Sequence, residues 1–429
     1  MAEKKISELT AKGATVADTD LMVISEVSGA SYVTKRVTGA NVKALVTDAN
    51  LTTSDITTND VSTAKHGFAP KAPNDTAKFL RGDGTWAVPA GGGLTEFTEL
   101  ETTAAPNATV PVNSLTPVTA TTNADFALIP KGNGALLVKI PDNAGTGGNK
   151  RGQFALDLQL ATDFATRVAS GNYSTIIGGQ GNTASGTHSL ASGGYSVASG
   201  NYSVALGAST SSSTYTLAAG QSSTASADGA VSLGRSNTSS GNRSFTAGFN
   251  NTASGTSSYA IGEECTAAAN YATATGYQAN TSTILGRQSH AISSGFQQSN
   301  WLLRRNTSGN TLTYLTTDGN DEFQGGATNM FLLVNNQAMR FKGTIIGKQS
   351  GSANVASWDI DGLVVRTTSA ANTTLVISNV NVVSNSPAWG TPTLTANTTR
   401  GGISVSVTGA SATNINWTCY LETTEVIYA

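Results

Sequence analysis

Short stretches in which small and large side chains alternate before a glycine recur along the middle of the chain. Residues 203–207 read Ser-Val-Ala-Leu-Gly, and residues 258–262 read Ser-Tyr-Ala-Ile-Gly. Alternation with a period of two places the large and the small residues on opposite faces of a short strand. The glycine that follows permits a tight turn, because glycine adopts positive φ at little cost. Each unit therefore predicts a short strand that ends in a turn.

These units repeat from about residue 171 to residue 290. A second run of small residues, as in 183–186 and 252–255, follows in most units and predicts a return strand. A regular period over many units is the signature of a solenoid of stacked rungs. One rung buries only two or three modest side chains, so we expect rungs to stack and chains to associate. The closing glycines are spaced by 14 residues, with one step of 13: Gly193, Gly207, Gly220, Gly234, Gly248, Gly262 and Gly276.

The pattern changes on either side of this block, which we place at 166–295. Residues 296–429 contain longer, more hydrophobic candidate strands between Gly, Asn, Ser and Pro turns, which favours an antiparallel β-sandwich. Residues 94–165 predict a short β-rich segment of their own. The predicted core of the sandwich comprises Trp358, Ile360, Leu363 and Val365 from one side, and Ile415, Trp417 and Leu421 from the other.

The N-terminal part predicts a small unit and a linker. Within residues 1–50 we expect strands near 21–24 and 32–37 and a short helix at 42–46 capped by Asn41. Residues 51–93 are rich in Pro and Gly, which favours extended chain with tight turns. Phe79, Leu80 and Trp86 are large apolar groups for a linker, and three intertwined copies could bury them around a common axis.

Composition narrows the classes of function. Charged residues make up 12% of the 429 residues and the net charge is −2, so no overall attraction to nucleic acid is implied. No apolar run approaches the roughly 20 residues of a membrane span, so we expect no membrane insertion. Cys265 and Cys419 form no CxxC motif and predict free thiols. The glycines between 145 and 152 do not match a nucleotide-binding fingerprint, and no cofactor is expected.

Three kinds of sequence segment in the chain resemble known families. The 14-residue units, with Ser-Val-Ala-Leu-Gly at 203–207, resemble the head repeats of trimeric autotransporter adhesins. The stretch 62–86 resembles a segment that recurs in bacteriophage tail fibres, and 358–366 with 414–426 is similar to terminal β-sandwiches of phage virion proteins. The resemblance implies an all-β fibrous homotrimer with a central left-handed parallel β-roll and a C-terminal antiparallel β-sandwich.

The departures from the adhesin pattern favour the phage family. An adhesin of that class should carry a signal peptide, a coiled-coil stalk and a membrane-anchor barrel, and we expect none of these in this chain. A virion fibre needs no export signal, because it assembles in the host cytoplasm. We therefore expect a virion protein whose residues 1–50 dock to other structural proteins of the particle.

Candidate catalytic groups are few. The paired acids Glu263 with Glu264, Asp318 with Asp321 and Glu322, and Asp359 with Asp361 could serve a polysaccharide depolymerase. Acids this close in turns are more often solvated loop residues, so no enzyme is expected. The three histidines are scattered without ligand-like spacing, which predicts no metal site: they are His66, His188 and His290.

The resulting hypothesis is a tail fibre whose C-terminal sandwich recognises a host-surface glycan or protein. Asn385, Trp389 and Asn397 lie in predicted turns and are the candidates for receptor contact, although for Trp389 a packing role is the favoured interpretation. A head, collar or tail decoration that binds no receptor is the alternative, and a depolymerase is the third reading.

Overall fold

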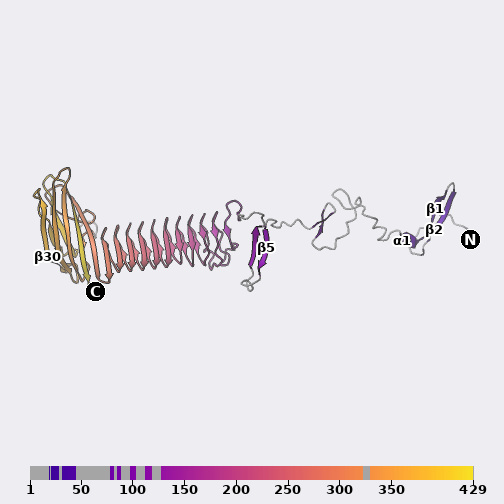
Figure 1. Cartoon of the computed structure of the whole chain (residues 1–429), viewed down its shortest axis with the longest axis horizontal. Helices are drawn as coiled ribbons and strands as arrows, with labels where there is room; N and C mark the ends of the chain where they lie inside the picture. Colours follow the sequence, from indigo (N-terminus) through magenta and orange to yellow (C-terminus); the bar gives the residue numbers. More distant parts are fainter. Residues whose placement is uncertain are drawn as a thin grey trace. The chain divides into compact units, whose positions relative to one another are not determined.

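The structure is a computed structural model that describes residues 19, 21–28, 31–44, 78–81, 85–87, 97–102, 112–117, 127–321 and 329–428. The chain divides into two compact units, residues 1–126 and residues 127–429, both drawn in Figure 1. Nearly all of the regular structure in the described residues is β, as the alternating pattern predicts. Their α-helix, α1 (Gly39–Ala44), has six residues, and no helix among them is long and apolar enough to cross a bilayer.

The first unit consists of short hairpins. β1 (Leu21–Ser28) and β2 (Ser31–Thr38) pair antiparallel, which confirms the two predicted strands. They lead into α1, which begins at Gly39, three residues before the start expected from the sequence. The cap is Thr38 rather than Asn41, because the Thr38 Oγ1 accepts a hydrogen bond from the Asn41 N–H at 3.2 Å. Two further hairpins pair β3 (Phe79–Leu80) with β4 (Trp86–Ala87) and β5 (Phe97–Thr102) with β6 (Val112–Pro117).

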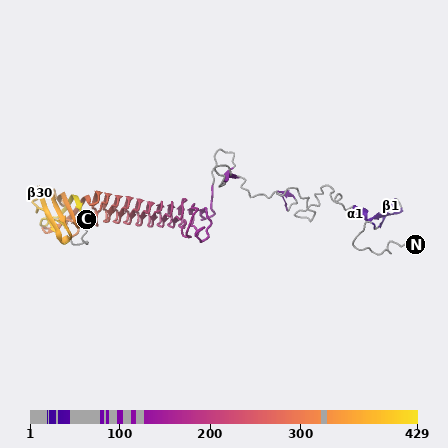
Figure 2. The ribbon, with the colours of Figure 1, turned by 90° about the horizontal axis from the view of Figure 1, so that it is seen from below.

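The second unit begins as a parallel solenoid, seen in Figures 1 and 2 as a row of short strands. Seven rungs, within residues 175–267, give one strand to each of two sheets, which confirms the predicted strand and return strand. The return strands form a seven-stranded sheet: β10 (Thr183–Ala184), β12 (Val197–Ala198), β14 (Thr210–Ser211), β16 (Thr224–Ala225), β18 (Thr238–Ser239), β20 (Thr252–Ala253) and β22 (Thr266–Ala267).

The opposite strands belong to one long sheet of sixteen strands. Parallel pairing in it starts at Leu136, inside the segment 94–165, so the solenoid begins before the glycine repeat does. Its parallel members are β7 (Leu136–Leu137), β8 (Leu156–Asp157), β9 (Thr175–Ile176), β11 (Leu190–Ser192), β13 (Val204–Leu206), β15 (Leu217–Gln221), β17 (Val231–Arg235), β19 (Phe245–Phe249), β21 (Tyr259–Glu263), β23 (Thr273–Tyr277) and β24 (Gln288–Ser293).

The interior of the solenoid holds the small residues of the alternation. Ala205, Ser232 and Ala260 are fully buried, whereas Tyr259 and Ile261 are 44% and 40% exposed on the outer face. Most inward positions of the rungs are alanine, serine or threonine, although Ile176 is fully buried in an early rung. Most large residues of the repeat units therefore face outward.

The closing glycines are required by the rung geometry. Gly248 has φ of +115°, and a Cβ at this position would lie 2.0 Å from the carbonyl oxygen of Gly262 in the next rung. Both the backbone conformation and the close approach exclude a larger residue. The 14-residue glycine period thus follows directly from stacking.

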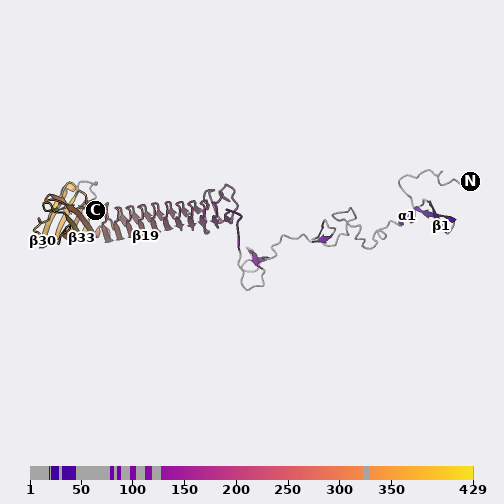
Figure 3. The same ribbon diagram turned by 90° about the horizontal axis from the view of Figure 1, so that it is seen from above.

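The long sheet continues without a break into an antiparallel sandwich, labelled β33 and β30 in Figure 3. β24 pairs antiparallel with β25 (Phe296–Thr307), and the order continues through β33 (Ile415–Ile427), β28 (Gln337–Gln349), β29 (Val355–Arg366) and β30 (Thr373–Asn385). A second, four-stranded sheet covers its inner face: β26 (Leu312–Tyr314), β32 (Gly402–Thr408), β27 (Phe331–Leu332) and β31 (Thr393–Asn397).

The sandwich core is built from large side chains. Trp358, Ile360, Ile415, Trp417 and Leu421 are buried there as predicted. The prediction is wrong for Leu363 and Val365, which face the other side of β29. Gly362 and Val364 occupy the inward positions instead, and a Cβ on Gly362 would lie 2.3 Å from the Phe341 ring. Because Gly362 has no apolar side chain, the alternation of hydrophobic residues in the sequence does not identify it as a core position.

Candidate functional site

One line of outward-facing side chains follows the strand register along the long sheet. Over the solenoid it is apolar, and over the sandwich it is polar. The apolar part, which we call the apolar stripe, comprises Leu190, Val204, Leu217, Val231, Phe245 and Tyr259. After Thr273 and Gln288 the same line continues through Asn300, Glu422, Lys342, Asp361 and Asn379.

Two adjoining hollows lie on the polar part of this face, where β25, β33, β28 and β29 run side by side. The first has a volume of about 480 Å³ and is lined mainly by Gln298, Asn300, Arg340 and Thr424. The second, of about 380 Å³, is lined mainly by Thr344, Asp359, Asp361 and Tyr420. Lys342 and Glu422 line both hollows and separate them.

Two ion pairs organise the charges of this face. Arg340 Nη2 lies 2.7 Å from Asp361 Oδ2, and the hydrogen bond from Arg340 lowers the pKa of that carboxyl group. Lys342 Nζ lies 3.1 Å from Glu422 Oε2 and lowers the pKa of Glu422 in the same way. The Tyr420 hydroxyl donates to Glu422 Oε1 at 3.3 Å. Both carboxylates therefore remain ionised acceptors at neutral pH.

Asp361 and Glu422 are poor candidates for the proton donor of a glycosidase. A glycosidase needs one carboxyl group that keeps its proton near neutral pH, which requires a raised pKa. Asp361 and Glu422 are shifted in the opposite direction. The sequence predicts that Asp359 and Asp361 lie in a turn, and this prediction is wrong. They lie two residues apart on one face of β29.

The other candidate acids lie in or beside turns and have structural contacts or are exposed. Burial alone would raise the pKa of Asp318, but hydrogen bonds from Asn320, Asn329 and Thr316 lower it overall. Asp321 pairs with Arg305, and Glu322 lies outside the described residues. In the solenoid, Glu264 accepts a hydrogen bond from the Gln278 amide at 2.6 Å and its neighbour Glu263 is exposed.

The predicted receptor residues have structural contacts. Trp389 is 7% exposed and packs edge-on against Trp417, with ring centroids 5.6 Å apart. The Asn385 side chain binds both the N–H and the carbonyl oxygen of Trp389. Asn397 Oδ1 accepts from the N–H groups of Thr399 and Arg400 and so holds a turn. The packing alternative for Trp389 agrees with this placement, while receptor contact by the three residues stays a prediction.

No group of three metal-binding side chains occurs in the part of the chain that the structure describes. His290 Nδ1 hydrogen-bonds Thr275 Oγ1 at 3.0 Å on the outer face of β24, and His66 falls outside the described residues. Cys265 and Cys419 are buried free thiols, as predicted. Burial raises the pKa of both thiols, which makes them unreactive.

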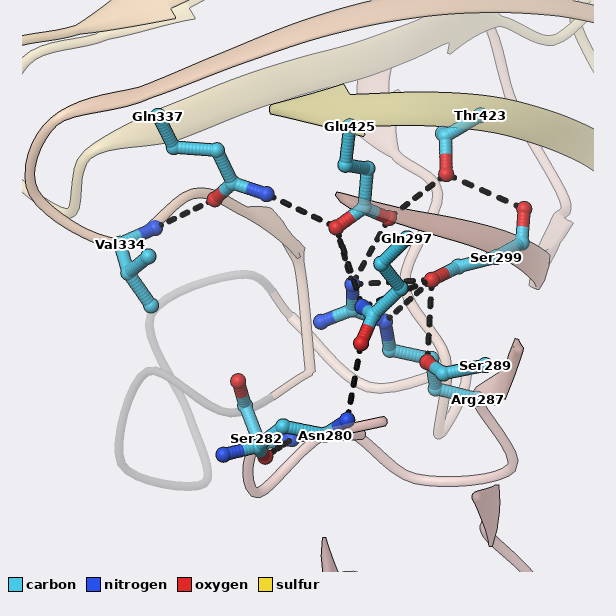
Figure 4. Close-up of polar contacts among 10 residues, drawn as sticks. All are labelled: Asn280, Ser282, Arg287, Ser289, Gln297, Ser299, Val334, Gln337, Thr423 and Glu425. Carbon is cyan, nitrogen blue, oxygen red and sulfur yellow. Dashed lines mark hydrogen bonds and ion pairs between the residues drawn. The ribbon is translucent and has the colours of Figure 1, made fainter. Parts of the chain in front are cut away.

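A buried polar cluster joins the last rung of the solenoid to the sandwich (Figure 4). The Arg287 Nη2 lies 2.7 and 2.6 Å from the two carboxylate oxygens of Glu425 on β33, and both side chains are almost completely buried. Glu425 also accepts hydrogen bonds from Gln297, Gln337 and Thr423. Burial lowers the pKa of Arg287 and the Glu425 charge opposes that shift. The cluster is saturated with internal partners, so it is a structural joint.

Aromatic rings form a ladder along one turn edge of the solenoid. Five consecutive rings stack with centroids 4.7–5.2 Å apart and planes within 14° of parallel. Each residue has a φ between +54° and +57°, which is strained for a large side chain. Ring stacking compensates for part of this strain. The ladder consists of Phe154, Tyr173, His188, Tyr202 and Tyr215.

Sequence reasoning missed the polar hollows and the buried pair. The signal for the hollows is the alternation Trp-Asp-Ile-Asp at 358–361, which places two carboxylates on the face opposite a core tryptophan. No local signal links Arg287 to Glu425, because they are 138 positions apart.

Comparison with known protein families supports the resemblance of the repeats. Residues 184–210, 211–237 and 253–279 match the model described as YadA head domain repeat (2 copies). The predicted similarity to adhesin head repeats is therefore confirmed for this part of the chain. A comparison with curated protein sequences finds no match.

Among solved structures, the chain is similar to the tailspike protein gp49 from Acinetobacter baumannii bacteriophage Fri1, described as a capsular polysaccharide depolymerase. The identity is 10% and the TM-score is 0.22, over 68% of this chain and 44% of that one. This chain spans less than half the length of that tailspike, and the likeness is too weak to transfer a fold or an activity. The repeats thus form a parallel β-solenoid and resemble the head repeats of adhesins.

Proposed function

We propose that this chain is a structural fibre protein of a bacteriophage virion, assembled as a homotrimer in the host cytoplasm. Residues 1–50 dock to other proteins of the particle, and the C-terminal sandwich extends toward the host surface for recognition and adsorption. The observation that carries the proposal is the apolar stripe, which together with the neighbouring Ile261 leaves large side chains such as Tyr259 uncovered in a single chain. A contiguous exposed apolar surface marks an interface between proteins.

The repeat chemistry supports copies of the same chain as the partner. The stripe contains no charged residue over six strands, so it offers packing surface without charge to direct a different partner. The matched YadA head repeats are similar to those of trimeric adhesins. Burying the stripe around a three-fold axis would give the thin rungs the hydrophobic core that they lack internally.

Light scattering after size-exclusion chromatography tests the assembly. We expect three times the 43.6 kDa mass of one chain. Phe245→Lys should dissociate the trimer, because it places a charge in the stripe. Thr238→Lys, on the opposite sheet, is the matched control and should leave the mass unchanged. A monomeric wild-type chain at micromolar concentration would contradict the proposal.

The position in the particle is tested by electron microscopy of intact virions with gold labels on residues 1–50 and 296–429. The proposal requires the first label at the particle and the second at the free end. Labels on the head or collar would favour the decoration alternative. A depolymerase, the third reading, would release reducing ends from host polysaccharide.

A deletion of the sandwich is a poor test of recognition. It would remove Glu425 and leave Arg287 buried without its partner, which destabilises the last rung as well. Surface substitutions in the full chain avoid this problem. Asn397→Ala tests the predicted receptor contact, with the host-binding affinity as its measurement.

A further inference from the structure

The outer face of the sandwich has the opposite polarity to the solenoid face that it continues. The apolar stripe ends at Tyr259. At the positions paired with it in the following strands, from Gln288 onward, the side chains are amides or charged groups. Strands in a sheet rotate by about 20° each, so β29, four strands beyond β24, faces a direction turned by roughly 80° from the stripe. The polar face therefore turns away from the surface that copies of the chain would bury, and remains open to water.

Open hydrogen-bonding groups converge on this face. Within the described residues, the side-chain amides of Gln298 and Asn300 make no hydrogen bond, although both line the first hollow. In the second hollow, Asp359 Oδ1 accepts from the Thr344 hydroxyl at 3.2 Å and keeps its remaining acceptor positions. These amide and carboxylate groups match the donors and acceptors of vicinal sugar hydroxyls.

Tyr420 adds a flat apolar surface beside these polar groups. Its side chain is 41% exposed in the second hollow, and its hydroxyl is held by Glu422. An aromatic ring fixed in this way can pack against the C–H face of a pyranose. A polar cleft with one aromatic platform suits a sugar better than an apolar ligand.

The charges of the face indicate which sugars fit. In the lining of the two hollows, Arg340 and Lys342 are already paired with Asp361 and Glu422, and Asp359 leaves this lining with one net negative charge. The lining therefore has no unpaired cation for a uronic or sialic acid carboxylate. Electrostatic repulsion would weaken the binding of an acidic sugar.

We infer that the two hollows form one binding site for an uncharged oligosaccharide, with one sugar ring in each hollow and the Lys342–Glu422 pair between them. Each volume lies within the roughly 300–1,000 Å³ of small-molecule sites. Asn300 and Gln298 bind hydroxyls in the first hollow, and Asp359 and Tyr420 bind the ring in the second. This inference rests on the proposed function, because it names the ligand class of the recognition surface.

The test uses the full chain on an array of neutral, amino and uronic-acid oligosaccharides. We expect binding to neutral oligosaccharides, weakened about tenfold or more by Asp359→Asn, Asn300→Ala and Tyr420→Ala. Asp359→Lys should shift the preference toward uronic-acid oligosaccharides. The matched controls are Asp228→Asn and Tyr271→Ala, which change exposed residues on solenoid turns and should bind as the wild type does.

Three results would overturn the inference: no binding to neutral sugars, stronger binding of acidic ones by the wild type, or variants that bind like the controls. A protein partner would be indicated if binding to intact host cells were lost after protease treatment of the cells. Light scattering on every variant shows whether the trimer is still assembled, so a failure of the sugar site can be distinguished from a failure of the proposed fibre. A trimer that adsorbs to cells without binding neutral sugars would reject the site and keep the fibre.

Discussion

Along β19 of the solenoid, Thr246 is buried and Phe245 is half exposed, whereas along β29 of the sandwich Trp358 is buried and Asp359 is exposed. Both strands belong to the same sheet and follow the same alternation of faces. What differs is the space behind the sheet. A sandwich separates its sheets by about 10 Å, while the interior of the rungs is lined mainly by alanine, serine and threonine.

The inversion shows that alternation alone does not identify the inside of a strand. In the solenoid, the face with large residues lies on the outside of the chain, where Tyr259 and Ile261 are exposed. In the sandwich, the second sheet covers that face within one chain. The same pattern therefore predicts self-association in one region and an independent core in the other.

The largest effect should come from a methyl group added to a closing glycine. Gly248→Ala forces a Cβ to 2.0 Å from the Gly262 carbonyl oxygen at a φ of +115°, so adjacent rungs must separate. We expect a loss of at least about 4 kcal/mol, measured by thermal unfolding followed by circular dichroism. Gly286→Ala is the control, because its Cβ would meet nothing within 4 Å. It should cost about 1 kcal/mol, from the positive φ alone. Equal losses in the two variants would refute the stacking requirement.

The joint between the two regions should be nearly as sensitive. Glu425→Gln leaves the buried Arg287 charge without its counter-ion, and breaking a buried pair in this way costs about 3–5 kcal/mol. The melting of solenoid and sandwich should shift together, because the cluster contacts both. Glu422→Gln, on the exposed pair with Lys342, should change the melting temperature little. Independent melting of the two regions would show that the joint does not couple them.

The two cores should be sensitive to opposite changes of side-chain volume, with a loss of stability in both cases. Trp358→Ala opens a cavity in the sandwich and should cost about 3–5 kcal/mol. Ala260→Val overfills a rung and should cost about 1–3 kcal/mol. Both are read from chemical denaturation of the full chain. If the rung tolerates valine without loss, the solenoid interior is wider than its all-small lining indicates.

The smallest effect concerns acid pH. The hydrogen bonds to Asp318 lower its pKa from the usual 3.8, so the stability that they add is present above about pH 4 and lost as the pH falls through the folded-state pKa. Asp318→Asn should therefore reduce the difference in melting temperature between pH 7 and pH 3. An unchanged difference would show that this turn does not contribute to acid sensitivity.

Much of the fold could be predicted from the sequence because its contacts are local and periodic. The closing glycines and the small residues at 183–186 and 252–255 are tied to neighbours one rung away, so the repeat itself encodes the pairing. The core tryptophans Trp358 and Trp417 were recognisable from their strands. Gly362 was not, because a glycine in a core position carries no hydrophobic signal.

The candidate site was harder to predict for a physical reason. Its walls come from strands that are adjacent in space but distant in sequence, as with Asn300, Lys342 and Glu422. A single strand shows only which residues share a face. Which faces lie next to each other depends on the order β25-β33-β28-β29, and the residue pattern does not contain that order.

The ion pair between Arg287 and Glu425 has a consequence for the timing of synthesis. Rungs pair with neighbours about 14 residues away, so they can form as the chain emerges, but the last rung must wait for a partner 138 residues later. At 5–20 residues per second this delay is on the order of ten seconds. During that interval β24 is covered by β25, but the edge of β25 that pairs with β33 is uncovered, and a ribosome that pauses within the sandwich would prolong its exposure to other nascent chains.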